Sequence, residues 1–171
     1  KEIDKPEIET IILSGDLDLL QLVDENTKMY GLKRGLSDTI IYDIKGVKEK
    51  YDGLKPDQLI DYKALRGDPS DNIPGVKGVG EKTAITLLNE FKTLDNIYKN
   101  IDSDKIKDAV RKKLIEDKEK AYISQKLATI IDKVPIKFKL KDSQKQAINK
   151  PELIKLFQEY QFTSLVNKLP D

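Results

Sequence analysis

The sequence has 171 residues, enough to bury a hydrophobic core as one domain, or as one domain with a small companion. Apolar residues make up 38% of it and charged residues 36%, and a net charge of only +1 means that a nucleic-acid partner would have to be held by a local patch. The sequence contains no cysteine and no histidine, which excludes a thiol nucleophile, an imidazole base and an ordinary zinc site. Any catalysis must therefore use carboxylates, lysines, hydroxyl groups or a hard metal ion such as Mg²⁺.

Nothing in the sequence indicates a membrane or secreted protein. No apolar run approaches the length needed to cross a bilayer, and the charged start from Lys1 to Lys5 lacks the apolar stretch of a signal peptide. The absence of cysteine agrees with a reducing compartment. We therefore expect a cytoplasmic protein with no membrane partner.

The first predicted element is a strand. The β-branched apolar run at residues 8–13 ends at Ser14-Gly15 and is typical of a strand buried on both faces, as in a parallel sheet. Asp16 and Asp18 follow at once. Because ligands of open α/β sheets gather at the carboxyl ends of strands, this pair stands where a metal ion would bind. The alternative is that Asp16 only caps a helix that starts near Leu19.

Two further strands and two helices follow before the next functional motif. Alternating β-formers predict the strands, an aspartate in front of an apolar repeat predicts the start of the first helix, and a proline predicts the first turn of the second. The expected elements are strands at 27–32 and 39–42 around a turn at 33–35, a helix from Asp43 to Tyr51 ended by Gly53, and a helix from Pro56 to Leu65.

The segment from Gly67 to Lys82 combines an acidic turn with a glycine loop. Asp68 and Asp71 lie three residues apart in a turn that contains proline, so both carboxylates can point at one hard divalent cation. The alternative is that these aspartates belong to plain turns. The second acidic pair makes a site shared with Asp16 and Asp18 the preferred interpretation.

The second half of this segment has the features of a phosphate-binding loop. Gly75, Gly78 and Gly80 let the backbone approach a ligand closely, and lysines flank them. A helix that opens at Glu81 would present its free amide groups to an anion lying in front of Gly80. Loop and helix together form a unit of helix-hairpin-helix type.

The remainder of the chain is predicted to be mainly helical. We expect a helix at 94–99, one or two helices within 104–131, and a last helix at 151–160 whose apolar residues pack back on the body. Residues 134–140 alternate like a strand or an extended segment. The mixed charges of 104–120 are typical of a solvated face. The apolar residues expected to form the buried stripe of the second helical piece are Ile123, Leu127, Ile130 and Ile131.

Three motifs resemble one known family. Ser14 to Leu22, Tyr62 to Gly75 and Gly78 to Ala84 are similar, in order and spacing, to the structure-specific 5′ nucleases. Within that family the likeness is to the C-terminal half of the 5′-3′ exonuclease domain that precedes a bacterial DNA polymerase. The resemblance implies an α/β plus all-α fold: part of a PIN-like α/β body with a short parallel-type sheet at 1–55, a helix-three-turn-helix module at 56–131, and a C-terminal extended segment with docking helices at 132–171.

The same resemblance implies the activity and the site. Family members are monomers that cut DNA at a 5′ flap, nick or 5′ end during replication and repair, by two-metal hydrolysis with Mg²⁺ or Mn²⁺. A bacterial member would act at the nucleoid, and a polymerase domain would follow Asp171. The implied catalytic and metal-binding residues are Asp16, Asp18, Asp68 and Asp71; the implied DNA-binding residues are Lys77, Gly78, Gly80, Lys82 and Thr83; and main-chain carbonyls of Val76 and Val79 would hold a K⁺ ion.

The sequence also departs from the family pattern. The N-terminal half of such domains, with its further carboxylates, does not precede Lys1, so we expect this chain to bind DNA without forming a complete two-metal site by itself. Two alternatives remain. One is a DNA-binding helix-hairpin-helix module without catalysis, and the other is a phosphatase or nucleotide-processing enzyme with the same aspartates.

Overall fold

The computed structural model describes residues 8–32, 39–144 and 147–169. The predicted turn at 33–35 lies outside these ranges. The chain forms two compact units that divide between Pro135 and Ile136. Each unit is described by itself.

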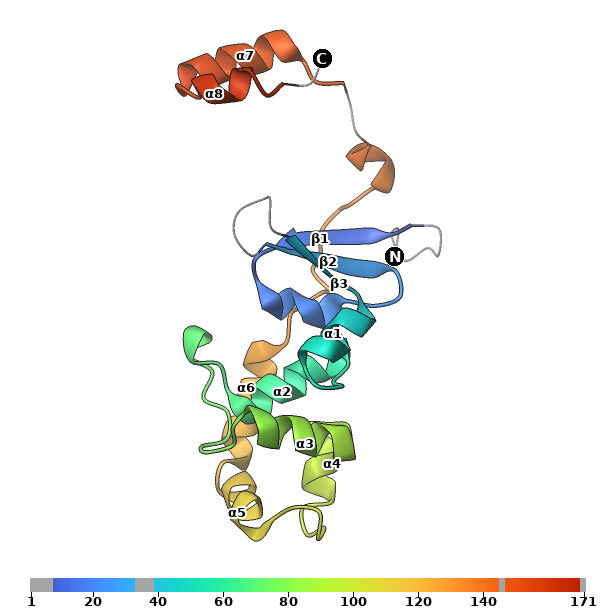
Figure 1. The fold of residues 1–171 in the computed structure, drawn as a ribbon, viewed down its shortest axis with the longest axis vertical. Helices are drawn as coiled ribbons and strands as arrows, with labels where there is room; N and C mark the ends of the chain where they lie inside the picture. Colours follow the sequence, from blue (N-terminus) through green and yellow to red (C-terminus); the bar gives the residue numbers. More distant parts are fainter. Residues whose placement is uncertain (1–7, 33–38, 145–146, 170–171) are drawn as a thin grey trace. The chain divides into compact units, whose positions relative to one another are not determined.

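The first unit begins with a three-stranded sheet (Figure 1). Strand β1 (Thr10–Ser14) pairs parallel to β2 (Thr27–Leu32), and β2 pairs antiparallel to β3 (Thr39–Tyr42). The 3₁₀-helix η1 (Leu17–Leu22) connects β1 to β2. The predicted bounds of β2 and β3 are confirmed.

Only one face of the sheet is buried. Met29 and Tyr42 point into a core that also contains Leu20 of η1. On the opposite face, Ile11 is 40% exposed and Leu13 is 59% exposed. The prediction that the first strand is buried on both faces is therefore wrong. Within the described residues helices cover one face, so alternate side chains of β1 point to solvent although they are apolar.

Helix α1 (Ile44–Lys50) starts where the sequence predicts. The Asp43 side chain accepts a hydrogen bond of 2.7 Å from the Gly46 amide, which satisfies one free amide of the first turn. Gly53 follows the helix with φ of +97°, a conformation that favours glycine. The chain then enters 3₁₀-helix η2 (Pro56–Gln58) and α2 (Leu59–Arg66), the helix that leads into the functional segment.

A helical layer surrounds α2 and contains the larger hydrophobic core. Leu65, Leu88, Leu94 and Leu114 are fully buried in it, and Tyr51 packs against both this core and the core of the sheet. The helices that complete the layer are α3 (Glu81–Phe91), α4 (Leu94–Lys99), α5 (Asp108–Glu116) and α6 (Lys118–Ala128).

Helix α6 packs through small residues, which the sequence analysis did not expect. Its buried side chains are Ala121, Ser124 and Ala128, whereas Ile123 is 54% exposed and Leu127 is 60% exposed. The predicted stripe of large apolar residues is therefore wrong. Small side chains on this face let α6 lie close against α2.

One buried carboxylate ties three of these helices together. Asp61 of α2 is only 8% exposed and accepts hydrogen bonds from the Leu94 amide (2.8 Å) and the Gln125 side chain (2.6 Å). Burial raises the pKa of Asp61, and the two hydrogen bonds oppose that rise. The Asp61 carboxylate therefore fixes the start of α4 and the middle of α6 relative to α2.

The second unit consists of 3₁₀-helix η4 (Leu140–Ser143), α7 (Lys150–Glu159) and α8 (Thr163–Val166). Residues 134–139 form no strand, so only the extended alternative holds for them. Leu156, Tyr160 and Phe162 are between 45% and 59% exposed. Docking of these helices on the first unit stays a prediction. No helix among the described residues is long and apolar enough to cross a membrane.

Candidate active site

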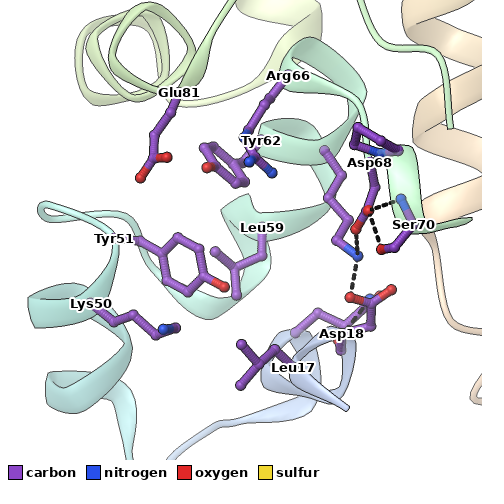
Figure 2. A pocket seen from close by; sticks show the side chains of 13 residues that line it. Leu17, Asp18, Lys50, Tyr51, Leu59, Tyr62, Arg66, Asp68, Ser70 and Glu81 are labelled. Atoms are coloured by element: carbon purple, nitrogen blue, oxygen red, sulfur yellow. Dashed lines mark hydrogen bonds and ion pairs between the residues drawn. The ribbon is translucent and has the colours of Figure 1, made fainter.

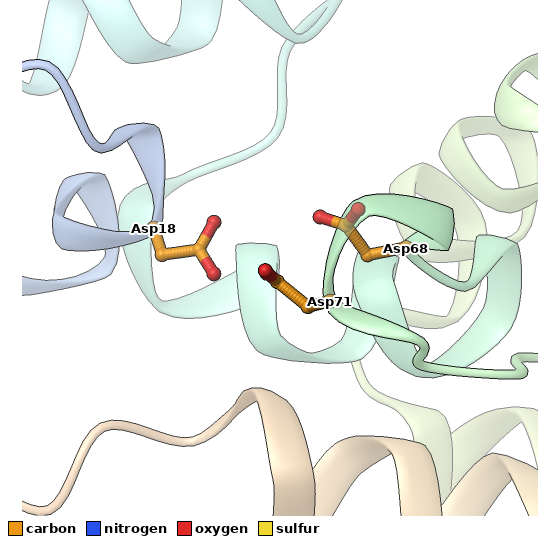
Figure 3. Close-up of side chains that lie close together, drawn as sticks. All are labelled: Asp18, Asp68 and Asp71. Carbon is orange, nitrogen blue, oxygen red and sulfur yellow. The ribbon is translucent and has the colours of Figure 1, made fainter.

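Three aspartates from two distant segments meet at one point (Figure 3). One carboxylate oxygen each from Asp18, Asp68 and Asp71 lies within 4.8 Å of the others. Asp18 belongs to the first turn of η1, directly after β1, and the other two come from the turn after α2. The fold thus brings together three of the four aspartates that the sequence analysis selected.

The local structure of the acidic turn explains how Asp68 is aimed. Asp68 and Ile73 exchange two main-chain hydrogen bonds of 2.9 Å, which close the turn around 3₁₀-helix η3 (Pro69–Asp71). Asp68 Oδ1 accepts from the amide (3.0 Å) and the hydroxyl (2.5 Å) of Ser70. Its other oxygen, Oδ2, is therefore the one directed at the cluster.

Asp16 lies outside this group. Its carboxylate accepts a 2.9 Å hydrogen bond from the Asp18 amide and caps η1. This is the capping alternative considered for Asp16. The structure thus brings Asp18, Asp68 and Asp71 together and places the Asp16 carboxylate on the start of its own helix; the metal role of Asp16 stays a prediction.

Lys63 is part of the site although the sequence analysis did not select it. Its ammonium nitrogen lies 2.8 Å from Asp68 Oδ2 and 3.8 Å from Asp71 Oδ2, and it also pairs with Asp18 Oδ1. Dashed lines in Figure 2 end at Asp18, Asp68 and Ser70, and the pairs of the unlabelled Lys63 with the two aspartates are among them. A signal was present: Lys63 occupies the last turn of the helix that delivers Asp68.

The pKa values follow from these contacts. The hydrogen bonds from Lys63 and Ser70 lower the pKa of Asp68 from 3.8 to about 2. Burial alone would lower the pKa of Lys63, but its hydrogen bonds to Asp18 and Asp68 raise that pKa above its ordinary value. Both groups are therefore charged at neutral pH.

The lowered pKa of Asp68 predicts an acid-sensitive contribution to stability. Because the carboxylate is more acidic in the folded than in the unfolded chain, its contribution is present above about pH 4 and is lost as the pH falls through about 2. Urea unfolding of wild type and Asp68→Asn measures it. We expect wild type to be more stable at neutral pH and the difference to vanish towards pH 2. A difference independent of pH would contradict this.

The three carboxylates fit a hard divalent cation. Ligands on opposite sides of Mg²⁺ lie about 4.2 Å apart, since each Mg–O distance is about 2.1 Å. The three oxygens lie within 4.8 Å of one another, so a small adjustment of the side chains lets them bind one ion. Asp71 is exposed and Asp18 and Asp68 are half-buried, so water can complete the coordination, as Mg²⁺ requires.

The glycine hairpin lies between the acidic turn and α3. Val76 and Val79 are buried and anchor it, and the Val76 amide donates to the Leu65 carbonyl of α2 at 2.9 Å. Lys77, Gly78, Gly80 and Lys82 remain exposed. Gly80 precedes α3, and the first amides of that helix have no partner within it. The exposed side of the hairpin is thus suited to bind an anion.

Three side chains, one from α5, one from α6 and one from the residue between these helices, hold the hairpin in place. Lys113 Nζ donates to the Gly78 carbonyl (2.9 Å), Asp117 accepts from the Lys77 amide (2.8 Å), and the buried Ser124 hydroxyl accepts from the Gly75 amide (2.9 Å). We call Lys113, Asp117 and Ser124 the hairpin clasp. The clasp was not predicted, because its members lie 35 to 49 residues along the chain from their partners.

Two carbonyl groups of the hairpin, where the K⁺ ion is expected, already accept hydrogen bonds. The Val76 carbonyl accepts the Val79 amide at 3.0 Å, and the Gly78 carbonyl is already taken by the Lys113 ammonium. The assignment of K⁺ to Val76 and Val79 stays a prediction, as do the DNA contacts of Lys77, Gly78, Gly80, Lys82 and Thr83.

A pocket of about 490 Å³ adjoins the aspartate cluster (Figure 2). Asp18, Lys63 and Asp68 contribute to its wall, and the rings of Tyr51 and Tyr62 also line it, in an edge-to-face contact with centroids 5.5 Å apart. The cluster is therefore reachable from solvent and has room beside it.

Comparison with solved structures defines the class of fold. Bacteriophage T5 5′-exonuclease with bound divalent zinc ions matches 70% of this chain and 42% of its own, with a TM-score of 0.62 and 22% identity. A T5 flap endonuclease complex with DNA and metal ions gives a TM-score of 0.58, with 23% identity over 70% of this chain and 42% of its own. The chain has the fold of a 5′ nuclease.

Sequence comparison then gives the family. The model of the 5′-3′ exonuclease C-terminal SAM fold matches residues 54–151, and the chain belongs to this family. DNA polymerase I of Caldicellulosiruptor bescii is 42% identical over 95% of this chain, and that of Bacillus subtilis is 41% identical over 99%. The chain spans only 19% of the length of each of these relatives.

Proposed function

We propose that this chain is the part of a Mg²⁺- or Mn²⁺-dependent 5′-3′ exonuclease or flap endonuclease that contributes carboxylates to the metal site and holds duplex DNA with its glycine hairpin. The observation that carries the proposal is the convergence of Asp18, Asp68 and Asp71 in the same compact unit as the exposed hairpin. Family membership and the fold of metal-bound 5′ nucleases support it. The parent protein would act on 5′ flaps, nicks or 5′ ends in replication and repair.

The residues have distinct roles in this proposal. Asp18, Asp68 and Asp71 would hold the divalent cation, and the remaining ligands would be water and the substrate phosphate. In such a site the bound metal supplies polarisation of the phosphate and activation of water. The first amides of α3, behind the hairpin, and Lys82 would bind DNA phosphates and fix the strand relative to the cluster.

One observation favours a second candidate, a DNA-binding module without catalysis. Lys63 pairs with all three aspartates and so satisfies the cluster without any metal. The two candidates differ in metal binding: saturable Mn²⁺ binding that is lost in Asp18→Ala and Asp68→Ala supports the nuclease, whereas no binding supports the module.

The DNA-binding part of the proposal predicts a phosphate contact at Lys82. Lys82→Ala should weaken binding about equally for duplexes of different sequence and should reduce the slope of log K against log salt by about 1, because one counterion fewer is released. Fluorescence anisotropy with several duplexes over a salt series measures both quantities. The exposed Lys48 of α1 is the matched control, and Lys48→Ala should leave affinity and slope unchanged. A loss confined to one sequence would contradict a phosphate role.

A further inference from the structure

Lys63 is the cation that the three aspartates share. It projects from the last turn of α2, and its side chain is only 15% exposed. Its ammonium pairs with Asp18 Oδ1, with Asp68 Oδ2 at 2.8 Å and with Asp71 Oδ2 at 3.8 Å. These three carboxylates are also the proposed metal ligands. The Lys63 ammonium and a divalent metal ion would therefore bind the same oxygens.

The charges explain why a lysine is placed there. Three carboxylates with oxygens within 4.8 Å of one another repel strongly when no cation lies between them. The Lys63 ammonium reduces the net charge of the group from −3 to −2 and so weakens this repulsion. Lys63 thus stabilises the fold of the acidic turn in the absence of metal.

We propose that Lys63 is the resident counter-ion of the metal site, and that a divalent cation must displace its ammonium from Asp18 and Asp68 in order to bind. The proposal rests on the proposed metal-dependent function. The ammonium stays charged throughout and only changes position, and the pocket of about 490 Å³ beside the cluster gives it room to withdraw. Lys63 therefore lowers the affinity of the cluster for metal while it protects the metal-free fold.

The geometry favours displacement of the Lys63 ammonium by the metal ion over binding of both at the same time. A Mg–O bond of about 2.1 Å places the metal on the lone pairs that face the centre of the cluster. Two of those oxygens, Asp18 Oδ1 and Asp68 Oδ2, already accept from Lys63. The second oxygen of Asp68 cannot substitute, because it accepts two hydrogen bonds from Ser70.

The test is Mn²⁺ titration of the complete chain by calorimetry, with Lys63→Met compared with wild type. We expect Lys63→Met to bind Mn²⁺ roughly tenfold more tightly. Thermal unfolding gives a second readout: Lys63→Met should melt below wild type in EDTA, and saturating Mn²⁺ should close the difference. Lys48→Met, a change at an exposed lysine on α1, should match wild type in both measurements.

A charge-retaining variant keeps the proposal falsifiable if Lys63→Met does not fold. Lys63→Arg preserves the positive charge and should bind Mn²⁺ with wild-type affinity; a tenfold gain in Lys63→Arg would overturn the proposal. Equal or weaker Mn²⁺ binding by Lys63→Met would overturn it too, since Lys63 would then arrange the carboxylates instead of competing for them. Absence of Mn²⁺ binding in both wild type and Lys63→Met would instead overturn the proposed function.

Discussion

Asp68→Asn is expected to abolish cleavage of a 5′-flap substrate by the full-length protein, with the rate falling by about a thousandfold or more. One carboxylate oxygen of Asp68 lies in the cluster with Asp18 and Asp71, and a neutral amide at this position holds a divalent cation far more weakly than a carboxylate. The loss of metal-derived stabilisation amounts to several kcal/mol, and each 1.36 kcal/mol is about tenfold in rate. DNA affinity should stay similar or rise slightly, because one negative charge near the phosphates is removed.

Single-turnover cleavage and anisotropy on the same flap substrate measure the two effects separately. The exposed Asp102 provides the control, since Asp102→Asn removes the same charge away from the cluster and should leave both quantities unchanged. Cleavage by Asp68→Asn at a rate near that of wild type would show that Asp68 is not a metal ligand.

Gly75→Ala should destabilise the first unit by about 3 to 5 kcal/mol. Gly75 has φ of +62°, and a Cβ atom there would lie 2.3 Å from the Gly67 nitrogen and 2.6 Å from its Cα. Because the neighbouring atoms are backbone, they cannot move aside without breaking the turn that positions Asp68. Urea unfolding measures the loss, and DNA binding should fall with it because the hairpin is displaced.

Gly80→Ala is the matched comparison in the same hairpin. Gly80 has φ of −92°, and a Cβ atom there would have no neighbour within 4 Å. The substitution should cost no more than about 1 kcal/mol, the difference between glycine and alanine at a helix N-cap. If Gly75→Ala and Gly80→Ala were equally stable, the close approach of the hairpin to the acidic turn would not hold in solution.

Local signals predicted the elements that position the site. Alternating β-formers placed β2 and β3, Asp43 marked the start of α1, and Glu81 after the glycines marked the start of α3. Each of these features depends on residues a few positions apart. The acidic pairs were also recognisable, because ligands gather at strand ends and carboxylates attract hard cations.

Features that depend on partners distant in sequence were missed. Lys63 pairs with Asp18 45 residues away, and Ser124 accepts from an amide 49 residues away. No local pattern identifies these two contacts, although the place of Lys63 in the last turn of α2 was a signal for its pair with Asp68. Leu13 and Ile123 were predicted to be buried but are exposed. The reason is related, because an apolar residue is buried only where another element covers it. The sequence could not show that Asp16 caps η1, because a cap and a metal ligand have the same residue type and the same place in the sequence.

The most direct measurement of the central claim is anomalous diffraction from crystals of this chain soaked in Mn²⁺. The account predicts a peak about 2.1 Å from one oxygen each of Asp18, Asp68 and Asp71, with the Lys63 ammonium moved away from Asp68. Well-ordered aspartates still bound to Lys63, with no peak between them at saturating Mn²⁺, would contradict it.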